Sequence, residues 1–366
     1  MSAISKVNTE PPAGTGQVGS TAAGTGQAGS NAAGTGGVGV PVLEVRGLTV
    51  TFRTEDGPLS AVDRVDFEVA DQEVLAVVGE SGCGKSVTAM SLAGLLPRTA
   101  SVDGSVRLDG RELVGADKKT LRSIRGREIA YIFQEPMTSL NPVFTVGNQI
   151  GEVLRIHNGL SRSTARKRSV ELLKLVGIPS AERRIDDYPH QLSGGMRQRV
   201  MIAMAVACDP KVLIADEPTT ALDVTIQAGI LDVLRGLRER LGTSIVLITH
   251  DLGVVADLAD RVAVMYAGRV VETANVNELF AQPKHPYTAG LLAASPSAGR
   301  HAGTHRLNEI PGLVPVLAEQ PNACTFADRC SRARDTCTTE QPLLTAEGTP
   351  NHHVACWNPV REPVEV

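Results

Sequence analysis

The stretch GESGCGKS at residues 79–86 decides the fold. It matches the pattern G-x-x-x-x-G-K-[ST], in which glycines let backbone N–H groups turn toward phosphate oxygens. The apolar run VLAVVG precedes it at 74–79, and a stretch with helical character follows from Lys85 to about Leu95. A strand, a glycine-rich turn and a helix in this order predict a phosphate site at a helix N-terminus. The alternative is a tight turn that binds nothing.

The residues of this loop are the first candidates for binding a nucleotide. We expect the ammonium group of Lys85 to reach the β- and γ-phosphates and the hydroxyl of Ser86 to ligate Mg²⁺. Cys83 occupies a variable position of the motif, and we assign no separate role to its thiol. The candidate binding residues are Gly79, Glu80, Ser81, Gly82, Cys83, Gly84, Lys85, Ser86 and Val87.

Two further apolar runs predict the sheet to which this loop belongs. KVLIADEP begins at Lys211 and SIVLITHD at Ser244, and both are typical of strands covered on both faces. Between them, QAGILDVLRGLRERLG has apolar residues at helical spacing. Strand, helix and strand in this order predict a parallel sheet with crossover helices. VLEVRGLTVTF and VDRVDFEV, ahead of the loop, alternate apolar and polar residues, which predicts half-buried antiparallel strands.

Polar side chains end two of the apolar strands. Asp216 and Glu217 close VLIADE, and His250 closes VLITH. Ligands of open α/β sheets bind at the carboxyl ends of strands, so we expect Asp216 to hold Mg²⁺ and Glu217 to act as general base toward the attacking water. The imidazole of His250 could hydrogen-bond the terminal phosphate or that water. Read alone, an acidic pair is a solvated strand end and a lone histidine is structural.

LSGGMRQR at 192–199 supplies a second helix N-terminus, formed by Ser193, Gly194 and Gly195. Such N-termini attract anions, yet one nucleotide does not need two of these sites from the same chain. We therefore predict a head-to-tail pair of chains, in which this second site caps the nucleotide held by the partner.

Together these motifs resemble the ABC ATPase superfamily over about residues 43–290. The resemblance implies ATP and Mg²⁺ as cofactors, active ATP hydrolysis, and an α/β fold: a P-loop NTPase core of the RecA-like type with an antiparallel β subdomain and an inserted helical subdomain. It makes Gln134 the Q-loop glutamine near Mg²⁺, Asp223 the end of the D-loop TTALD, and His250 the switch histidine. Phe52 is similar to the aromatic residue that stacks on adenine, with a core phenylalanine as the alternative.

Longer phrases resemble the ATP-binding subunits of oligopeptide, dipeptide and nickel importers. These phrases are QEPMTSLNP at 134–142, YPHQLSGGMRQR at 188–199, HPYTAGLL at 285–292 and IPGLVP at 310–315. The resemblance implies a motor for peptide uptake, with nickel or glutathione as alternative solutes. It also implies a second ATPase subunit, two transmembrane permeases and an extracytoplasmic solute-binding protein. For the second ATPase subunit, the resemblance favours a paralogue, with a second copy of this chain as the alternative. A soluble ABC ATPase acting on DNA or ribosomes is disfavoured, because the chain has one cassette and no sustained heptads between loop and signature.

Composition limits the other function classes. Thirty-six Lys and Arg against 40 Asp and Glu give a net charge of −4, without the basic character of a nucleic-acid-binding chain, so we expect no nucleic-acid partner. No run of about 18 apolar residues could span a bilayer, and the N-terminus lacks the features of a secretory signal. We therefore expect the chain to stay in the cytosol, and the resemblance to importer subunits implies a peripheral position at the cytoplasmic face of the cell membrane.

Changes of composition divide the chain into parts. Residues 1–40 repeat AGTG at 13, 23 and 33, and we expect a disordered tail rich in Gly, Ala and Thr. The nucleotide-binding domain is expected at 41–290, with a helical subdomain at about 140–208. Residues 291–366 are expected to form a small extension of the oligopeptide-importer type that lies outside the sheet.

The extension contains four cysteines, Cys324, Cys330, Cys337 and Cys356. Four thiols in a small polar segment of a cytosolic protein indicate ligands of Zn²⁺ or of an iron–sulfur cluster. The spacing lacks the C-x2-C pairs common in zinc sites, which favours an iron–sulfur cluster over zinc. The importer branch carries a similar C-x-F-x-x-R-C tail, and the resemblance to members of that branch implies a 4Fe–4S cluster here. The alternative is four free thiols in a small packed segment.

Overall fold

The structure, a computed structural model, describes residues 41–135, 139–220, 222–294 and 309–361. These residues belong to one unit that runs from Gly39 to Val366. The predicted disordered tail, residues 1–40, lies outside the described residues.

A large mixed sheet carries the phosphate loop. Among the described residues it has the strand order β11-β12-β10-β9-β3-β8-β7-β6. The strands β6, β7, β8, β3 and β9 are parallel to one another, which confirms the predicted parallel sheet. The bounds are β3 Val74–Val78, β6 Ile129–Ile132, β7 Val212–Asp216, β8 Ser244–Ile248, β9 Arg261–Tyr266, β10 Arg269–Asn275, β11 Thr345–Ala346 and β12 His353–Val354.

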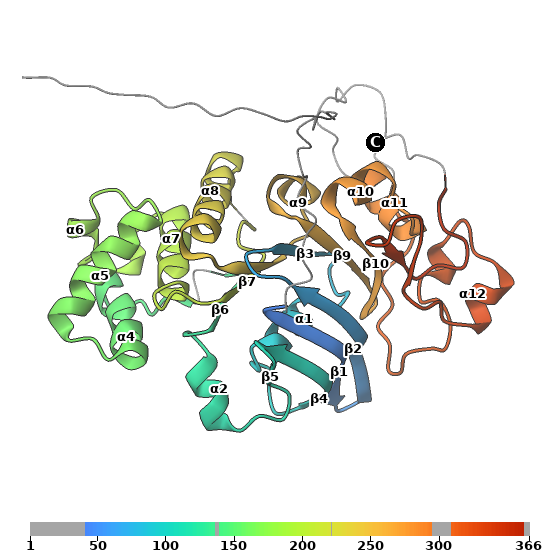
Figure 1. Cartoon of the computed structure of the whole chain (residues 1–366), viewed down its shortest axis with the longest axis horizontal. Helices are drawn as coiled ribbons and strands as arrows, with labels where there is room; N and C mark the ends of the chain where they lie inside the picture. The colour runs from blue at the N-terminus through green and yellow to red at the C-terminus, as the bar shows by residue number, and fades with distance from the viewer. Residues whose placement is uncertain (1–40, 136–138, 221, 295–308, 362–366) are drawn as a thin grey trace, which may run out of the picture. The chain divides into compact units, whose positions relative to one another are not determined.

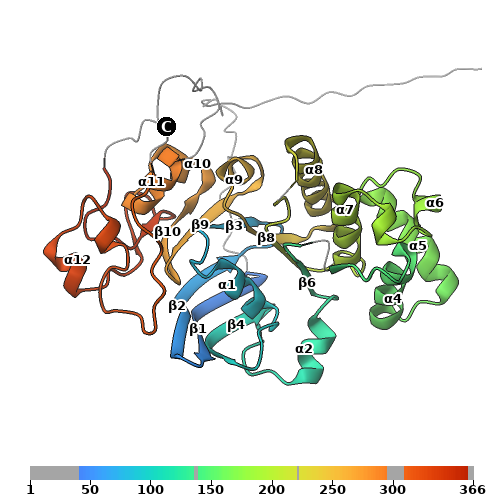
Figure 2. The ribbon, with the colours of Figure 1, turned by 180° about the vertical axis from the view of Figure 1, so that it is seen from behind.

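Helices cover this sheet and form the crossovers between its strands (Figures 1 and 2). Helix α8 connects β7 to β8; the carboxylate of Asp223 caps its start by accepting from the backbone N–H of Ile226, and Gly242 ends it with φ of +66°. The helices that flank the sheet are α1 Lys85–Leu92, α8 Val224–Leu241, α9 Leu252–Leu258, α10 Val276–Ala281 and α11 Pro286–Ala294.

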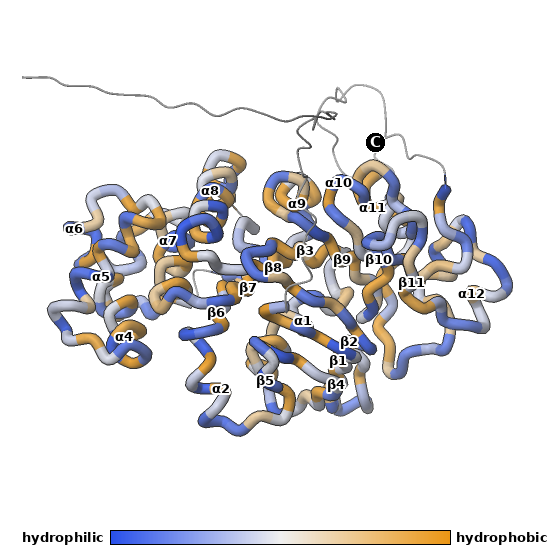
Figure 3. Tube along the Cα trace, viewed as in Figure 1, coloured by the Kyte–Doolittle hydropathy of each residue, from blue (hydrophilic) through white to orange (hydrophobic). Residues whose placement is uncertain are grey.

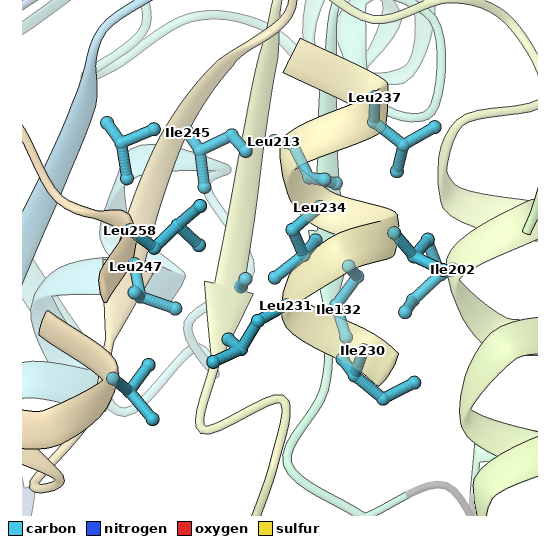
Figure 4. Close-up of a cluster of buried hydrophobic side chains, with 14 of the residues drawn as sticks. Ile132, Ile202, Leu213, Ile230, Leu231, Leu234, Leu237, Ile245, Leu247 and Leu258 are labelled. Carbon is cyan, nitrogen blue, oxygen red and sulfur yellow. The ribbon is translucent and has the colours of Figure 1, made fainter. Parts of the chain in front are cut away.

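The apolar core lies between α8 and the central strands. Every residue of β3, β7 and β8 is buried, as their continuous apolar sequence predicted. Figure 4 shows Leu231, Leu234 and Leu237 of α8 facing Leu213 of β7 and Ile245 of β8. Such burial of contiguous apolar side chains is the main source of stability for a sheet covered by helices.

A second, antiparallel sheet packs on the other side of α1. Its order is β2-β1-β4-β5, with β1 Leu43–Thr54, β2 Gly57–Val69, β4 Ala100–Leu108 and β5 Arg111–Glu112. Along β1 the residues Leu43 and Val45 are buried while Glu44 and Arg46 reach solvent, and Figure 3 lets the reader follow this alternation of hydropathy. The two N-terminal strands were predicted, whereas β4 carried no clear pattern in the sequence.

Residues of the segment at about 140–208, whose sequence has a helical pattern, fold into helices. Helices α4, α5 and α7 contact one another, and α7 also contacts α8 (Figure 1). The bounds in this segment are α4 Val146–Asn158, α5 Arg162–Leu175, α6 Ala181–Arg184, η1 Pro189–Gln191 and α7 Gly194–Ala205. Helix α2, Lys118–Ile124, precedes β6. In the described part of the chain, no helix has the length and apolar character needed to cross a membrane.

The prediction that the C-terminal extension lies outside the sheet was wrong. Strand β12 pairs antiparallel with β10, so that Val354 lies opposite Glu272, and β11 pairs with β12. The buried carboxylate of Glu272 binds Nε2 of His352 at 2.6 Å and accepts from the backbone N–H groups of Lys284 and His285. The two strands are two residues long, too short for a periodic pattern in the sequence. The remaining described elements of the extension are η2 Ala327–Arg329 and α12 Asp335–Thr339.

Truncation of Leu234 tests the core between α8 and the sheet. Leu234 is fully buried, and Leu234→Ala removes apolar contacts that neighbouring residues cannot refill, so the free energy of unfolding should fall by about 2–5 kcal/mol. Urea unfolding followed by circular dichroism measures the change. Leu343→Ala is the control, because Leu343 is 71% exposed and its loss should cost about 0.5 kcal/mol or less. Equal effects of both changes would contradict the assignment of the core.

Candidate nucleotide site

Glycines let the phosphate loop run close against neighbouring backbone. Gly79 follows β3 with φ of +151°, and a Cβ atom there would lie 2.3 Å from the carbonyl oxygen of Met265 on β9. Gly84 has φ of +102°, and a Cβ atom there would lie 2.5 Å from the carbonyl oxygen of Ala61 on β2. Any larger residue at either position would push the loop away from both sheets.

Lys85 begins α1 and is buried. Its ammonium group donates to the carbonyl oxygens of Gly79 at 2.7 Å and of Glu80 at 2.9 Å. The positive charge is therefore held inside the curve of the loop, next to the backbone N–H groups of the helix start. A loop of this shape with a central cation is suited to bind the phosphates of a nucleotide.

Asp216 ends β7 opposite Ser86. The hydroxyl of Ser86 donates to one carboxylate oxygen at 3.1 Å, and the phenol of Tyr131, on the neighbouring β6, donates to the other at 2.7 Å. Burial raises the pKa of Asp216, and the hydrogen bonds from Tyr131 and Ser86 oppose that rise. The structure thus brings together Ser86 and Asp216, as the sequence predicted, and adds Tyr131, which the sequence did not indicate.

Glu217 lies at the centre of a polar group at the carboxyl edge of the sheet. Its carboxylate accepts from Nε2 of Gln134 at 2.8 Å and from the hydroxyl of Thr220 at 2.8 Å, and it lies 3.2 Å from Nδ1 of His250. Burial alone would raise the pKa of Glu217, but the hydrogen bonds from Thr220 and His250 outweigh it, so the pKa is lowered. The side chain is therefore an ionised carboxylate at neutral pH.

The backbone of Glu217 is itself unusual. Its φ of +47° places a non-glycine residue in the left-handed region, which costs free energy and is concentrated at functional sites. Its N–H donates to the carbonyl oxygen of Ile248 on β8 at 2.9 Å, which holds this conformation. The carboxylate is thereby directed out of the sheet toward Gln134 and His250.

A cavity of about 360 Å³ opens beside the loop. Gln134, Glu217 and Phe52 of β1, the predicted adenine-stacking residue, are among the residues that line it. The cavity is lined by Phe52, Leu59, Ser60, Ala61, Ser81, Gly82, Gly84, Lys85, Ser86, Val87, Gln134, Glu217, Ala267, Gly268, Pro315, Val316, Leu317 and Gln320. The last four belong to the C-terminal extension, and the sequence did not predict them at this site.

The signature residues lie elsewhere in the chain. Ser193 caps α7, because its hydroxyl accepts from the backbone N–H of Met196 at 3.4 Å. A Cβ atom at Gly194 would meet no other atom within 4 Å, whereas one at Gly195 would lie 2.5 Å from Ile226 of α8. Neither these residues nor Asp223 are among the described residues that line the cavity. Figures 1 and 2 show α7 beside α4 and α5, and α1 beside the antiparallel sheet.

The structure does not support a metal site at the four cysteines. In the described ranges, no three or more His, Cys, Asp or Glu side chains form a group that could hold a metal ion. Cys324, Cys330, Cys337 and Cys356 are free thiols that are buried or half-buried. Burial raises the pKa of Cys356 to about 12 and also raises the pKa of Cys324 and of Cys330. The structure therefore does not support the predicted 4Fe–4S cluster, nor zinc as its alternative.

Comparison with known proteins decides the family. Residues 62–220 match the family ABC transporter, and residues 271–337 match the family Oligopeptide/dipeptide transporter, C-terminal region. A peptide import ATP-binding protein of Brucella abortus (strain 2308) is 53% identical over 84% of this chain and 92% of its own length. The chain belongs to the ABC transporter family. This ABC ATPase is also 52% identical, over 86% of its length and 94% of the relative, to a peptide ABC transporter ATP-binding protein of Sinorhizobium fredii.

Solved structures agree with the fold of the ABC ATPase. A dimeric ATP-binding cassette bound to ADP and Pi is 29% identical, with a TM-score of 0.58 over 64% of this chain and 98% of that one. CbiO1 of Clostridium perfringens, part of an ABC transporter complex, is 31% identical, with a TM-score of 0.56 over 66% of this chain and 90% of that one. These likenesses confirm the predicted fold class, and the protein hydrolyses ATP as this family does.

The hydrogen bond from Thr220 to Glu217 gives a prediction about acidity. Thr220→Val removes a donor to the carboxylate, so the pKa of Glu217 should rise toward the ordinary value for glutamate. Carbon-13 NMR of the glutamate carboxyl groups, followed through a pH titration, measures the shift. Thr225→Val is the control, since Thr225 is an exposed residue of α8, and an unchanged Glu217 titration in Thr220→Val would contradict this account.

Proposed function

We propose that this ABC ATPase is the motor subunit of an importer for peptides, working at the cytoplasmic face of the cell membrane. The observation that carries the proposal is the match of residues 271–337 to the C-terminal region of oligopeptide/dipeptide transporters. The names of the relatives from Brucella and Sinorhizobium, which specify peptide import or a peptide ABC transporter, support it. Nickel and glutathione are the alternative solutes.

The loop residues 79–87 would bind the phosphates of ATP, and Ser86 and Asp216 would hold Mg²⁺. The 3.1 Å contact between the Ser86 hydroxyl and the Asp216 carboxylate supports this, since Mg²⁺ prefers hard oxygen ligands and binds through one or two carboxylates. When bound, Mg²⁺ neutralises charge on the β- and γ-phosphates. Gln134 would approach the same ion, and Phe52 would stack on the adenine.

Glu217 would act as the general base. Its lowered pKa keeps the carboxylate ionised, and such a group can accept a proton from an attacking water. The 3.2 Å approach of His250 and the 2.8 Å bond from Gln134 support a role for both side chains in holding the carboxylate and the water in position.

A second ATPase subunit, a paralogue of this chain, would complete the site. Ser193, Gly194 and Gly195 would cap the nucleotide of the partner, with Asp223 close to the junction. Two observations support this arrangement: the signature residues do not line the cavity of their own chain, and the space around Gly194 is open. Helix N-termini of this kind favour phosphate groups.

Two transmembrane permeases and an extracytoplasmic solute-binding protein would complete the importer. Exposed apolar side chains within ten residues of Gln134 in the sequence support contact with a membrane-embedded partner, because exposed apolar groups mark interaction surfaces. Phe133 is 46% exposed, Phe144 is 48% exposed and Val143 is 70% exposed. Closure of the two ATPase subunits over ATP, followed by hydrolysis, would then drive alternating access in the permeases.

Glu217→Gln tests the proposed motor in the assembled transporter. We expect the variant to bind ATP normally and to hydrolyse it at least about 100-fold more slowly, because the amide cannot accept the proton of the attacking water. Steady-state phosphate release and uptake of a radiolabelled peptide into proteoliposomes measure hydrolysis and transport. Glu239→Gln is the matched control, since Glu239 is an exposed carboxylate on α8.

Two outcomes would overturn parts of this proposal separately. Hydrolysis by Glu217→Gln at the rate of the unaltered protein would remove Glu217 as the base. ATP-driven uptake of Ni²⁺ or glutathione, without uptake of any peptide by the same vesicles, would remove peptides as the solute while leaving the motor intact.

Ser193→Ala tests the proposed capping of the nucleotide of the partner. We expect turnover of the assembled transporter to fall on the order of 100-fold, as it does when one donor to a developing charge is removed, while ATP affinity of the isolated subunit stays unchanged. Ser161→Ala is the matched control, because Ser161 caps α5 in the same manner and its hydroxyl accepts from Thr164. Unchanged turnover in Ser193→Ala, or equal losses in both variants, would contradict the proposed role.

A further inference from the structure

Arg329 of the C-terminal extension has a partner for each of its five N–H donors. Its two terminal nitrogens donate to the two carboxylate oxygens of Glu80, at 2.7 and 3.0 Å, and also to the hydroxyl of Tyr266 and the carbonyl oxygen of Ile310, both at 3.3 Å. Its Nε donates to the carbonyl oxygen of Pro311 at 2.7 Å. The side chain is 6% exposed. Arginine alone offers five donors in a fixed planar arrangement, so no other residue could replace all of these bonds.

Aromatic rings hold the guanidinium group in this position. Its central carbon lies 5.6 Å from the centre of the Tyr266 ring and 5.9 Å from the centre of the Phe326 ring. Tyr266 is fully buried at the end of β9, and its ring contacts that of Phe326. Cation–π contacts in such a desolvated site add to the hydrogen bonds and restrict the rotamers of the arginine.

The acidic partner of Arg329 is the second residue of the phosphate loop. Glu80 is held at three points: Arg329 binds its carboxylate, the hydroxyl of Tyr287 accepts from its backbone N–H at 2.8 Å, and its carbonyl oxygen accepts from Lys85 at 2.9 Å. Tyr287 and Arg329 both belong to residues 271–337, outside the part that matches the ABC transporter family. Two side chains of the C-terminal region, Tyr287 and Arg329, therefore bind the phosphate loop at Glu80.

The segment held by Arg329 continues into the wall of the nucleotide cavity. After Pro311, the carbonyl oxygen of Leu317 accepts from the backbone N–H of Ser60 at 3.0 Å, and Nε2 of Gln320 donates to the carbonyl oxygen of Ala267 at 2.9 Å. Leu317 and Gln320 both line the cavity. One side chain, Arg329, thus connects the phosphate loop to the chain segment that borders the nucleotide.

We propose that Arg329 is a positioning residue of the ATPase site, which fixes the phosphate loop through Glu80 and thereby sets the affinity for nucleotide. A loop already held in its binding conformation loses less conformational entropy when phosphate binds. The positive charge of Arg329 also offsets the negative charge of the Glu80 carboxylate, which belongs to the loop and would otherwise repel the phosphates of the nucleotide. The proposal rests on the role of the loop in ATP binding proposed above.

Arg329→Met should weaken nucleotide binding without slowing the chemical step. Isothermal titration of the full chain with Mg·ADP should show a Kd raised on the order of tenfold, because charge-assisted bonds are among the stronger hydrogen bonds in proteins. The KM for ATP should rise by a similar factor, while kcat stays within about twofold, the result expected when an interaction common to ground and transition states is lost. Arg329→Lys keeps the charge but not the paired bonds, so its Kd should be intermediate.

A double-mutant cycle separates this role from a general loss of stability. Glu80→Gln should raise the Kd on the order of threefold, whereas in the Arg329→Met background it should not raise the Kd, since the carboxylate there already lacks its partner and its removal also removes its repulsion of the phosphates. Arg332→Met is the matched control, because Arg332 lies in the same extension, is exposed and donates to the carbonyl oxygen of Pro359 at 3.5 Å. Its Kd should equal that of the unaltered protein.

Lys85→Ala distinguishes an error in the proposed role of Arg329 from an error in the assignment of the phosphate loop as the nucleotide site. If Lys85→Ala abolishes binding while Arg329→Met leaves the Kd unchanged, Arg329 has no positioning role and the proposal is overturned. If Lys85→Ala binds Mg·ADP normally, the phosphate loop is not the nucleotide site, and both proposals fall. Should Arg329→Met fail to fold, Glu80→Gln decides the question, since it leaves the bonds from Arg329 to Pro311, Ile310 and Tyr266 in place; an unchanged Kd in that variant overturns the proposal.

Discussion

The close approach of the phosphate loop to the backbone of β9 and β2 is the constraint on which the rest of the site depends. At Gly79 and Gly84 there is no room for a side chain, so the loop curves around the ammonium group of Lys85. That curve places Ser86 opposite Asp216 of β7. The buried strands below fix this edge of the sheet, and the polar residues Gln134, Glu217 and His250 gather there as a consequence.

Much of this arrangement could be predicted from the sequence, because it rests on local patterns. Continuous apolar runs predicted β3, β7 and β8, and the residues that directly follow them predicted the polar edge. The motif at 79–86 fixed the position of Lys85 relative to the helix. By contrast, β4 and β12 were not recognised: one lacks a clear alternation, and the other is two residues long and depends on the buried contact between His352 and Glu272.

Two contacts that the sequence did not indicate join residues far apart in the chain. Tyr131 and Asp216 are 85 residues apart, and Glu80 and Arg329 are 249 residues apart. Tyrosine in a strand and arginine in a polar tail are common features, and only the fold brings them to the site. For the cysteines, clustering in the sequence predicted a metal site that the structure does not support, because the described side chains do not form a group that could hold a metal ion.

The pairing of β12 with β10 has a consequence for where this protein can be divided. A chain ended near residue 290 would keep every motif of an ABC ATPase, yet it would leave the outer backbone of β10 open to pairing with other molecules. The Glu272 carboxylate would also lose its hydrogen-bond partner His352. A fragment that contains only the ATPase motifs would therefore lack the strand that completes the edge of the sheet. For this protein, the boundary of the folding unit lies beyond the boundary of the catalytic motifs.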